Sequence, residues 1–189
     1  MASAQDGPRD FEITPIGGYR FGGTFGIDGS SDSYEFADSA SFGLILNLRE
    51  QHNTQWELLY STQSTDAELN GAGTTTSVGI ESHTLQFGGT YQGQDDRLRP
   101  YVALTLGGTH LSTDADSDTF FSGSIGLGFQ VMPNERIGIR LEARAYGVLT
   151  DSDTDLFCQT GPNQNICAVR VDGDIFSQFE TFAGLVLRF

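Results

Sequence analysis

The sequence of 189 residues contains no lysine, and its ten basic residues, all arginine, face 25 Asp and Glu. The formal net charge at pH 7 is therefore -15. A protein that binds nucleic acid needs a basic surface to neutralise phosphates. We therefore exclude nucleic acid as a partner.

Long hydrophobic stretches are also missing. No run of about 18 apolar residues occurs, so the sequence predicts no transmembrane helix. The slightly negative mean hydropathy still permits a membrane barrel, because barrel strands alternate lipid-facing and interior residues. The 24 Gly, 14 Phe and 6 Tyr, with abundant Thr and Ser and no long helix-forming runs, indicate an all-β protein.

Cysteine is scarce, with only Cys158 and Cys167 present. In an exported protein two cysteines this close together most simply form a local disulfide. The C-x8-C spacing is a poor zinc motif, because no second pair or nearby histidine completes it. We therefore predict a disulfide.

The first residues suggest export. Ala2-Ser3-Ala4 has the A-x-A form of a signal-peptidase site, with cleavage before Gln5. The charged and apolar parts of a signal peptide are not seen, so a chance alanine-rich start is the alternative. We expect residues 1–4 to be a signal remnant or an added start, and residues 5–189 to form a single domain.

The last fifteen residues show strict alternation. Apolar side chains fall at every second position up to Phe189, and Gln178, Glu180 and Arg188 lie between them. This pattern predicts a strand with one apolar and one polar face. A strand of this kind avoids an exposed edge if it pairs with the first strand and turns its apolar face to lipid.

Eight segments alternate in this way. They lie at about 11–25, 34–49, 55–65, 84–91, 101–107, 121–131, 137–149 and 175–189. The connections after even-numbered segments are short, and those after odd-numbered segments, such as 65–78 and 151–174, are longer and polar. The sequence therefore predicts an eight-stranded antiparallel up-and-down transmembrane β-barrel with both termini at one end.

Aromatic residues are expected at the two membrane interfaces. For the periplasmic interface we predict Trp56, Tyr91, Tyr101 and Phe189. For the outer interface we predict Tyr34, Phe121 and Phe179.

The start FEITPIGGYRFGG, the eight alternating segments and the ending GLVLRF together resemble the small outer-membrane β-barrel proteins, a group that includes the OmpA membrane domain and OmpX. The resemblance implies a bacterial outer-membrane location, with the acidic loops extracellular and both termini periplasmic. It also implies a monomer whose partners are outer-membrane lipid, lipopolysaccharide and, during assembly, the barrel-insertion machinery. In that family the terminal aromatic strand is the assembly signal, which here corresponds to Phe179, Leu185, Leu187 and Phe189.

The inward face of the predicted barrel carries a charge network. Its members are Glu12, Arg20, Arg49, Glu57, Arg140, Glu142, Arg144, Glu180 and Arg188. Unpaired buried charge costs several kcal/mol, and an eight-stranded barrel is just wide enough for side chains to fill it. We expect Arg–Glu pairs to close the lumen. The alternative is a narrow pore for ions or small solutes, in which water fills the space beside the small inward residues of the fourth to sixth segments.

The predicted outer loops are acidic and contain two runs with Asp at alternate positions. These are Asp114, Asp116 and Asp118, and Asp151, Asp153 and Asp155. Oxygen ligands at this spacing suit Ca²⁺, although neither run has the Gly and distant Glu of an EF-hand loop. The alternative is a solvated acidic surface. A divalent cation at these loops could bridge them to anionic lipopolysaccharide, and we predict no other cofactor.

Catalytic signals are few. His83 follows Ser82, and His110 precedes Ser112 by two positions, but neither pair forms a nucleophile motif. We therefore expect a non-enzymatic outer-membrane protein with a structural or surface-interaction role. A pore and a lipid-modifying enzyme are the alternatives. A soluble lipocalin-type barrel is disfavoured, because it would need an apolar interior.

Overall fold

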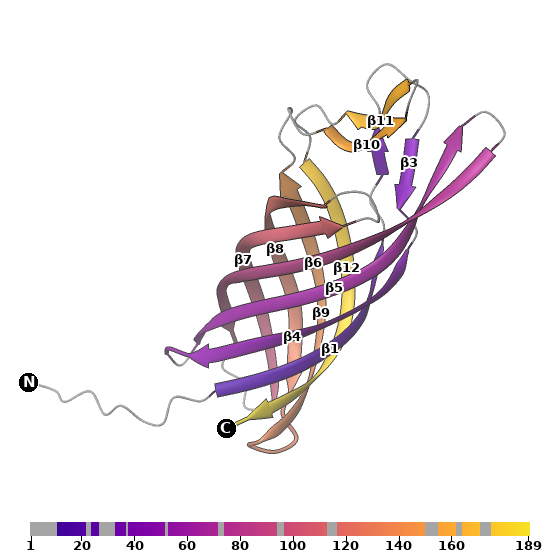
Figure 1. Ribbon diagram of the computed structural model, residues 1–189. Coiled ribbons are helices and arrows are strands. Elements are labelled where there is room, and N and C mark those ends of the chain that lie inside the picture. The colour runs from indigo at the N-terminus through magenta and orange to yellow at the C-terminus, as the bar shows by residue number, and fades with distance from the viewer. Residues whose placement is uncertain are drawn as a thin grey trace, which may run out of the picture.

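The computed structural model describes residues 11–21, 24–26, 33–36, 38–51, 53–71, 74–93, 97–112, 117–149, 155–161, 164–170 and 175–189. Eight of its strands form a closed antiparallel up-and-down barrel, as predicted (Figure 1). They are β1 (Phe11–Phe21), β4 (Ser39–Arg49), β5 (Thr54–Gly71), β6 (Thr74–Gln92), β7 (Leu98–Ser112), β8 (Ser117–Val131), β9 (Ile137–Leu149) and β12 (Ile175–Arg188). No helix in the described part of the chain is long and apolar enough to cross a membrane.

Pairing of the first and last strands closes the barrel. Glu12 lies opposite Arg188, and the register continues to Phe21 opposite Phe179. Beyond the last ladder pair, the Phe189 amide donates to the Phe11 carbonyl at 2.8 Å. Because every barrel strand has two neighbours, backbone donors and acceptors are paired around the wall, as a bilayer requires.

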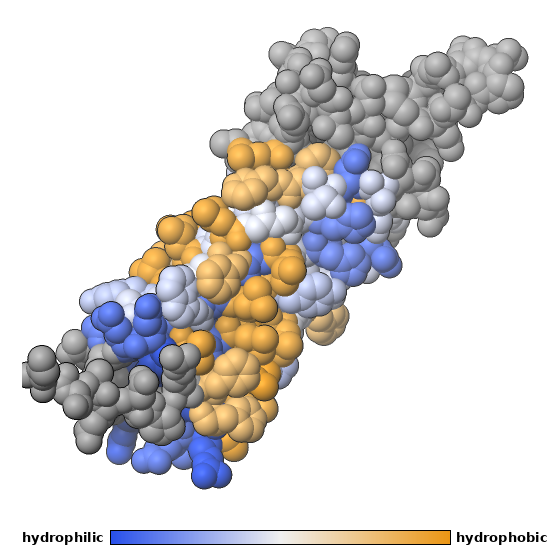
Figure 2. Space-filling view, turned by 60° about the vertical axis from the view of Figure 1, so that its left-hand side comes forward, coloured by the Kyte–Doolittle hydropathy of each residue, from blue (hydrophilic) through white to orange (hydrophobic). Residues whose placement is uncertain are grey.

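The two faces of each strand follow the predicted alternation. On β9, Ile137 and Ile139 are 46% and 49% exposed, whereas Arg140 and Arg144 are buried. This reverses the arrangement of a soluble protein, in which large apolar side chains are inside. On the face drawn in Figure 2, hydrophobic side chains cover much of the middle of the barrel. An apolar exterior and a polar interior are typical of a transmembrane barrel.

The connections at the end of the barrel that holds Phe11 and Phe189 are short. In the β8–β9 turn the side-chain oxygen of Asn134 accepts hydrogen bonds from the amides of Arg136 and Ile137, at 3.0 and 2.7 Å. An asparagine that bonds its own backbone in this way is a common means of making a tight turn. This turn and those at β4–β5 and β6–β7 lie where short connections were predicted.

At the opposite end the predicted long loops are partly wrong. The 65–78 segment, predicted as a loop, continues the β5–β6 hairpin up to the pair Gly71 and Thr74. Its β-branched threonines favour paired strands even where no apolar face is needed. Strand β1 ends at Phe21 instead of residue 25, and the first connection contains β2 (Thr24–Gly26) and β3 (Ser33–Phe36).

The connection from β9 to β12 also contains a hairpin, formed by β10 (Asp155–Gly161) and β11 (Gln164–Arg170). Its register places Cys158 directly opposite Cys167. Opposed residues of antiparallel strands have Cα atoms about 4.5–5.5 Å apart, within the span of a disulfide. The cysteine side chains lie outside the described residues, so the disulfide stays a prediction.

Candidate functional site: a charged network inside the barrel

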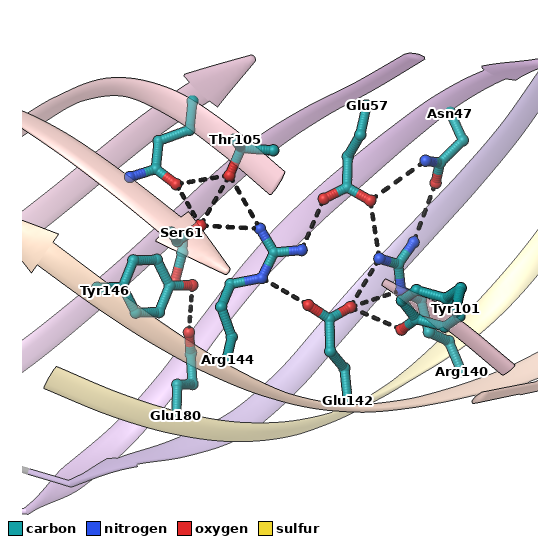
Figure 3. Close-up of polar contacts among 12 residues, drawn as sticks. Asn47, Glu57, Ser61, Tyr101, Thr105, Arg140, Glu142, Arg144, Tyr146 and Glu180 are labelled. Carbon is teal, nitrogen blue, oxygen red and sulfur yellow. Dashed lines mark hydrogen bonds and ion pairs between the residues drawn. The ribbon is translucent and has the colours of Figure 1, made fainter. Parts of the chain in front are cut away.

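Four charged side chains meet in the middle of the barrel. Glu57 comes from β5, and Arg140, Glu142 and Arg144 come from β9; together they form what we call the charge ring (Figure 3). Glu57 accepts from Arg140 at 2.8 Å and from Arg144 at 2.6 Å, each through a different carboxylate oxygen. Glu142 does the same at 2.7 Å and 2.6 Å. Each carboxylate therefore joins both arginines, and each arginine joins both carboxylates.

The charge ring is neutral and shielded from solvent. The exposed fractions of Glu57 and Arg144 are 0%, and those of Arg140 and Glu142 are 2% and 5%. A buried ion pair is often no more stabilising than well-packed apolar side chains. Removal of one partner, however, leaves the other charge buried without a counter-charge, which is strongly destabilising. The ring therefore constrains which residues the interior tolerates.

Neutral groups complete the hydrogen bonds of Arg140 and Glu142. Arg140 donates to Asn47 at 3.1 Å, and its guanidinium lies over the Tyr101 ring, 4.5 Å from the centroid. The Tyr101 hydroxyl donates to Glu142 at 2.6 Å. Tyr101 is 4% exposed, so its predicted place at the membrane interface is wrong. It shares the inward face of β7 with Ala103 because both occupy odd positions.

Arg144 lies against small residues of the nearby strands β7 and β8. Its third guanidinium nitrogen donates to Thr105 and Ser124, both at 3.1 Å. Gln86 accepts from the same two hydroxyls at 2.9 and 2.7 Å. These hydroxyl and amide groups were not predicted as site residues. Their inward position on alternating strands is the signal that could have identified them.

Two glycines of β8 make room for this arrangement. A Cβ atom on Gly126 would lie 2.0 Å from a carboxylate oxygen of Glu142. One on Gly128 would lie 2.5 Å from the Tyr101 hydroxyl. Long side chains from β7 and β9 thus occupy the space that small residues on β8 leave.

Two further ion pairs flank the charge ring. Toward the loop end, Arg20 pairs with Glu180 at 3.2 Å, and its guanidinium lies 4.5 Å from the centroid of the Tyr146 ring. The Tyr146 hydroxyl donates to the same Glu180 oxygen. Toward the terminal end, Arg188 donates to Glu12 at 2.8 Å.

Eight of the nine predicted lumen charges therefore belong to three groups, which are the charge ring and the two flanking ion pairs. The ninth is Arg49. Arg49 lies half-buried at the end of β4, opposite Gln55. The three groups contain four arginines and four glutamates, so their charges balance. The structure shows which of the predicted charges pair.

Some buried polar atoms near these groups have no hydrogen-bond partner among the described residues. Toward the loop end they include Gln63 Oε1 and Ser82 Oγ. Toward the terminal end they include Gln55 Nε2 and Thr90 Oγ1. Buried polar groups without a protein partner usually bond ordered water.

The predicted Ca²⁺ ligands are mostly beyond what the structure describes. Asp114, Asp116, Asp151 and Asp153, and the side chain of Asp155, lie outside the described residues, and Asp118 lies in β8. Among the described residues, no three His, Cys, Asp or Glu side chains are grouped to hold a metal ion. The calcium site stays a prediction.

The two serine–histidine pairs do not form catalytic dyads among the described residues. Ser82 is 4% exposed and faces the interior, whereas the neighbouring His83 faces outward, because adjacent strand residues point to opposite sides. His110 bonds Thr119 through Nδ1 at 2.9 Å.

The predicted assembly signal lies on the outer face of β12 and at the chain's last position. Phe179 and Leu185 are each 47% exposed, Leu187 is half-buried, and Phe189 is 73% exposed. These side chains are presented to the exterior of the barrel, where another protein could contact them.

An acidic chain folded as a closed eight-stranded barrel, with aliphatic residues outside and paired charges inside, defines a class: the small transmembrane β-barrels. The chain belongs to the family described as outer membrane protein beta-barrel domain, whose profile matches residues 1–172. No curated protein matches it in sequence.

Two solved structures show the same fold. Neisserial surface protein A is 11% identical, with a TM-score of 0.67 over 95% of this chain and 97% of that one. The outer membrane protein OprG from Pseudomonas aeruginosa is 14% identical, with a TM-score of 0.65 over 96% of each chain. At this identity the likeness concerns the fold alone.

We expect Arg144→Met to destabilise the barrel by about 3–5 kcal/mol, because it leaves Glu57 and Glu142 buried with half of their ionic partners. Urea unfolding of the refolded protein in lipid vesicles measures this. The double variant Glu57→Gln/Arg144→Met should recover part of the loss. Arg136→Met, at an exposed turn, is the control and should change stability by no more than about 0.5 kcal/mol. Equal effects of Arg144→Met and Arg136→Met would contradict the role of the ring.

Gly126→Ala tests the space that the ring needs. The new methyl group would displace Glu142, and we expect a loss of about 1–3 kcal/mol in the free energy of unfolding. The matched control is Gly123→Ala on the same strand, whose Cβ would meet the end of the outward Leu106 side chain at 2.9 Å. Because Leu106 can turn into the lipid, the control should lose less. A Gly126 variant as stable as the Gly123 variant would show that Glu142 is free to move.

Proposed function

We propose that the protein is a non-enzymatic outer-membrane barrel with a structural or surface-interaction role, and that its lumen is closed to solutes. The charge ring carries this proposal. It spans the interior from β5 to β9, and both of its arginines are fixed by two carboxylates each. A permeating ion would have to separate charges that lie 2.6–2.8 Å apart in a site without solvent.

The orientation that suits this role places the loop end outside the cell and both termini in the periplasm. The Asp runs fall in the sequence around the β7–β8 connection and between β9 and β10, and Ca²⁺ held by them would bridge the protein to lipopolysaccharide. A surface role requires exposed segments, and the β5–β6 and β10–β11 hairpins extend the barrel in that direction (Figure 1). Neisserial surface protein A, which shares the fold, is by its name a surface protein.

A narrow pore is the second function that an observation favours. Buried polar atoms without protein partners lie on both sides of the charge ring. Water at these atoms would form two hydrated segments with the ring between them. The lumen would then conduct only if the ring opened.

Planar-bilayer recordings separate these functions. For the wild-type barrel we expect no stable conductance steps, because the ring blocks the path. Glu142→Gln should produce brief openings, since it weakens the ring, and Glu135→Gln, in the exposed β8–β9 turn, should stay silent. Stable steps from the wild-type protein would overturn the closed lumen and establish the pore.

We also propose that Phe189 is the principal contact of the chain with the barrel-insertion machinery. Its side chain is 73% exposed, and only its backbone bonds Phe11. Phe189→Ala should lower the amount of folded protein in the outer membrane of expressing bacteria several-fold, while refolding of the purified chain in detergent is unchanged. Phe121→Ala, at a residue 55% exposed near the loop end, is the control. Equal membrane levels of the two variants would contradict the proposal.

A further inference from the structure

The apolar band on the outer wall ends abruptly on β5 to β8. Its last cross-strand row consists of Tyr60, Leu85, Gly108 and Phe121. The next outward row toward the loops consists of Thr62, His83, His110 and Thr119. Two imidazoles thus lie opposite each other on neighbouring strands, at the edge of the surface that faces lipid.

In both histidines the Nδ1 atom is already engaged by a hydroxyl group. His83 Nδ1 lies 3.1 Å from the Tyr60 hydroxyl, and the two rings are stacked. His110 Nδ1 lies 2.9 Å from the Thr119 hydroxyl. When Nδ1–H donates to the hydroxyl oxygen, Nε2 keeps its lone pair for a ligand. Metal-binding histidines are usually oriented by such a bond at the other ring nitrogen.

A carboxylate lies beside this pair. Glu81 precedes His83 by two positions on the same face of β6, and its Oε2 is 4.0 Å from His83 Nε2. Two ligands that each lie about 2.0–2.2 Å from a metal ion can be separated by up to about 4 Å. Both side chains are exposed, at 64% and 40%, so they can adjust to an ion.

The charges favour a cation over an anionic headgroup. Glu81 would repel phosphate at this position, and the net charge of -15 enriches cations around the protein. Imidazole nitrogens suit zinc, copper and nickel, whereas Ca²⁺ prefers oxygen ligands. The donor set therefore favours a transition metal.

We propose that His83 and His110, with Glu81, bind a divalent transition-metal ion such as Cu²⁺, Ni²⁺ or Zn²⁺ at the edge of the lipid-facing band. Directly opposed residues have Cβ atoms about 4.5–5.5 Å apart, so both Nε2 atoms can reach one ion. As they stand, the three side chains are not grouped around a common point. Rotation of the exposed side chains and bound water complete the coordination. The site is independent of the lumen and of the proposed function.

Titration of the refolded protein with Cu²⁺ in detergent micelles, followed by calorimetry and electron paramagnetic resonance, tests the site. We expect a single high-affinity ion with nitrogen ligands in the spectrum. His83→Asn and His110→Asn should each weaken binding about tenfold or more, and Tyr60→Phe should weaken it about tenfold because it releases Nδ1 of His83. His52→Asn, which lies between β4 and β5 in the sequence, is the control and should bind as the wild type does.

The titration can overturn the metal site as well as support it. A heat-induced gel shift confirms that each variant is folded before titration. The absence of Cu²⁺ binding by the wild type would overturn the proposal. Binding that survives in the His83→Asn/His110→Asn double variant, or that disappears in His52→Asn alone, would assign the ion to other groups and would also overturn it.

Discussion

Every charge inside this barrel needs a counter-charge inside the barrel, and the rest of the interior follows from that requirement. Neither the lipid outside nor the narrow lumen can solvate an unpaired carboxylate cheaply. The charge ring meets the requirement with two residues of each sign, and it joins β5 to β9, which are not hydrogen-bonded neighbours. The ring therefore ties together opposite parts of a wall whose backbone bonds connect only adjacent strands.

Balanced charge alone does not fit into an eight-stranded lumen, so residue size must also be distributed. Arg144 of β9 reaches toward β7 and β8, where Thr105, Ser124 and Gly126 are small. Larger residues at these positions would occupy the space of the guanidinium groups. The strands that contribute glycine and hydroxyl groups are thus as necessary to the site as β5 and β9, which contribute its charges.

Alternation in the sequence was sufficient to predict the eight strands and the face of each charge, because lipid outside and a polar lumen impose a period of two. It failed beyond the lipid band, where the β5–β6 hairpin continues without an apolar face to mark it. Alternation also could not determine which charged side chains pair. Glu57 and Arg144 are on strands that are not neighbours, and they meet only because the sheet closes into a barrel. The prediction for Tyr101 was wrong because the position of this residue in the alternation, and not its aromatic character, determines which face it occupies.

The connectivity of the charge ring bears on whether the interior is a plug or a path. In a simple ion pair one bond breaks and one carboxylate is released. Here Arg140 and Arg144 each hold both carboxylates. Displacing Glu57 therefore removes a partner from both arginines at once, in a site where each lost charge-assisted bond is expensive. Both arginines would lose a partner together, so opening of the lumen would require several bonds to break at once. This cooperativity favours a closed barrel over one that opens readily.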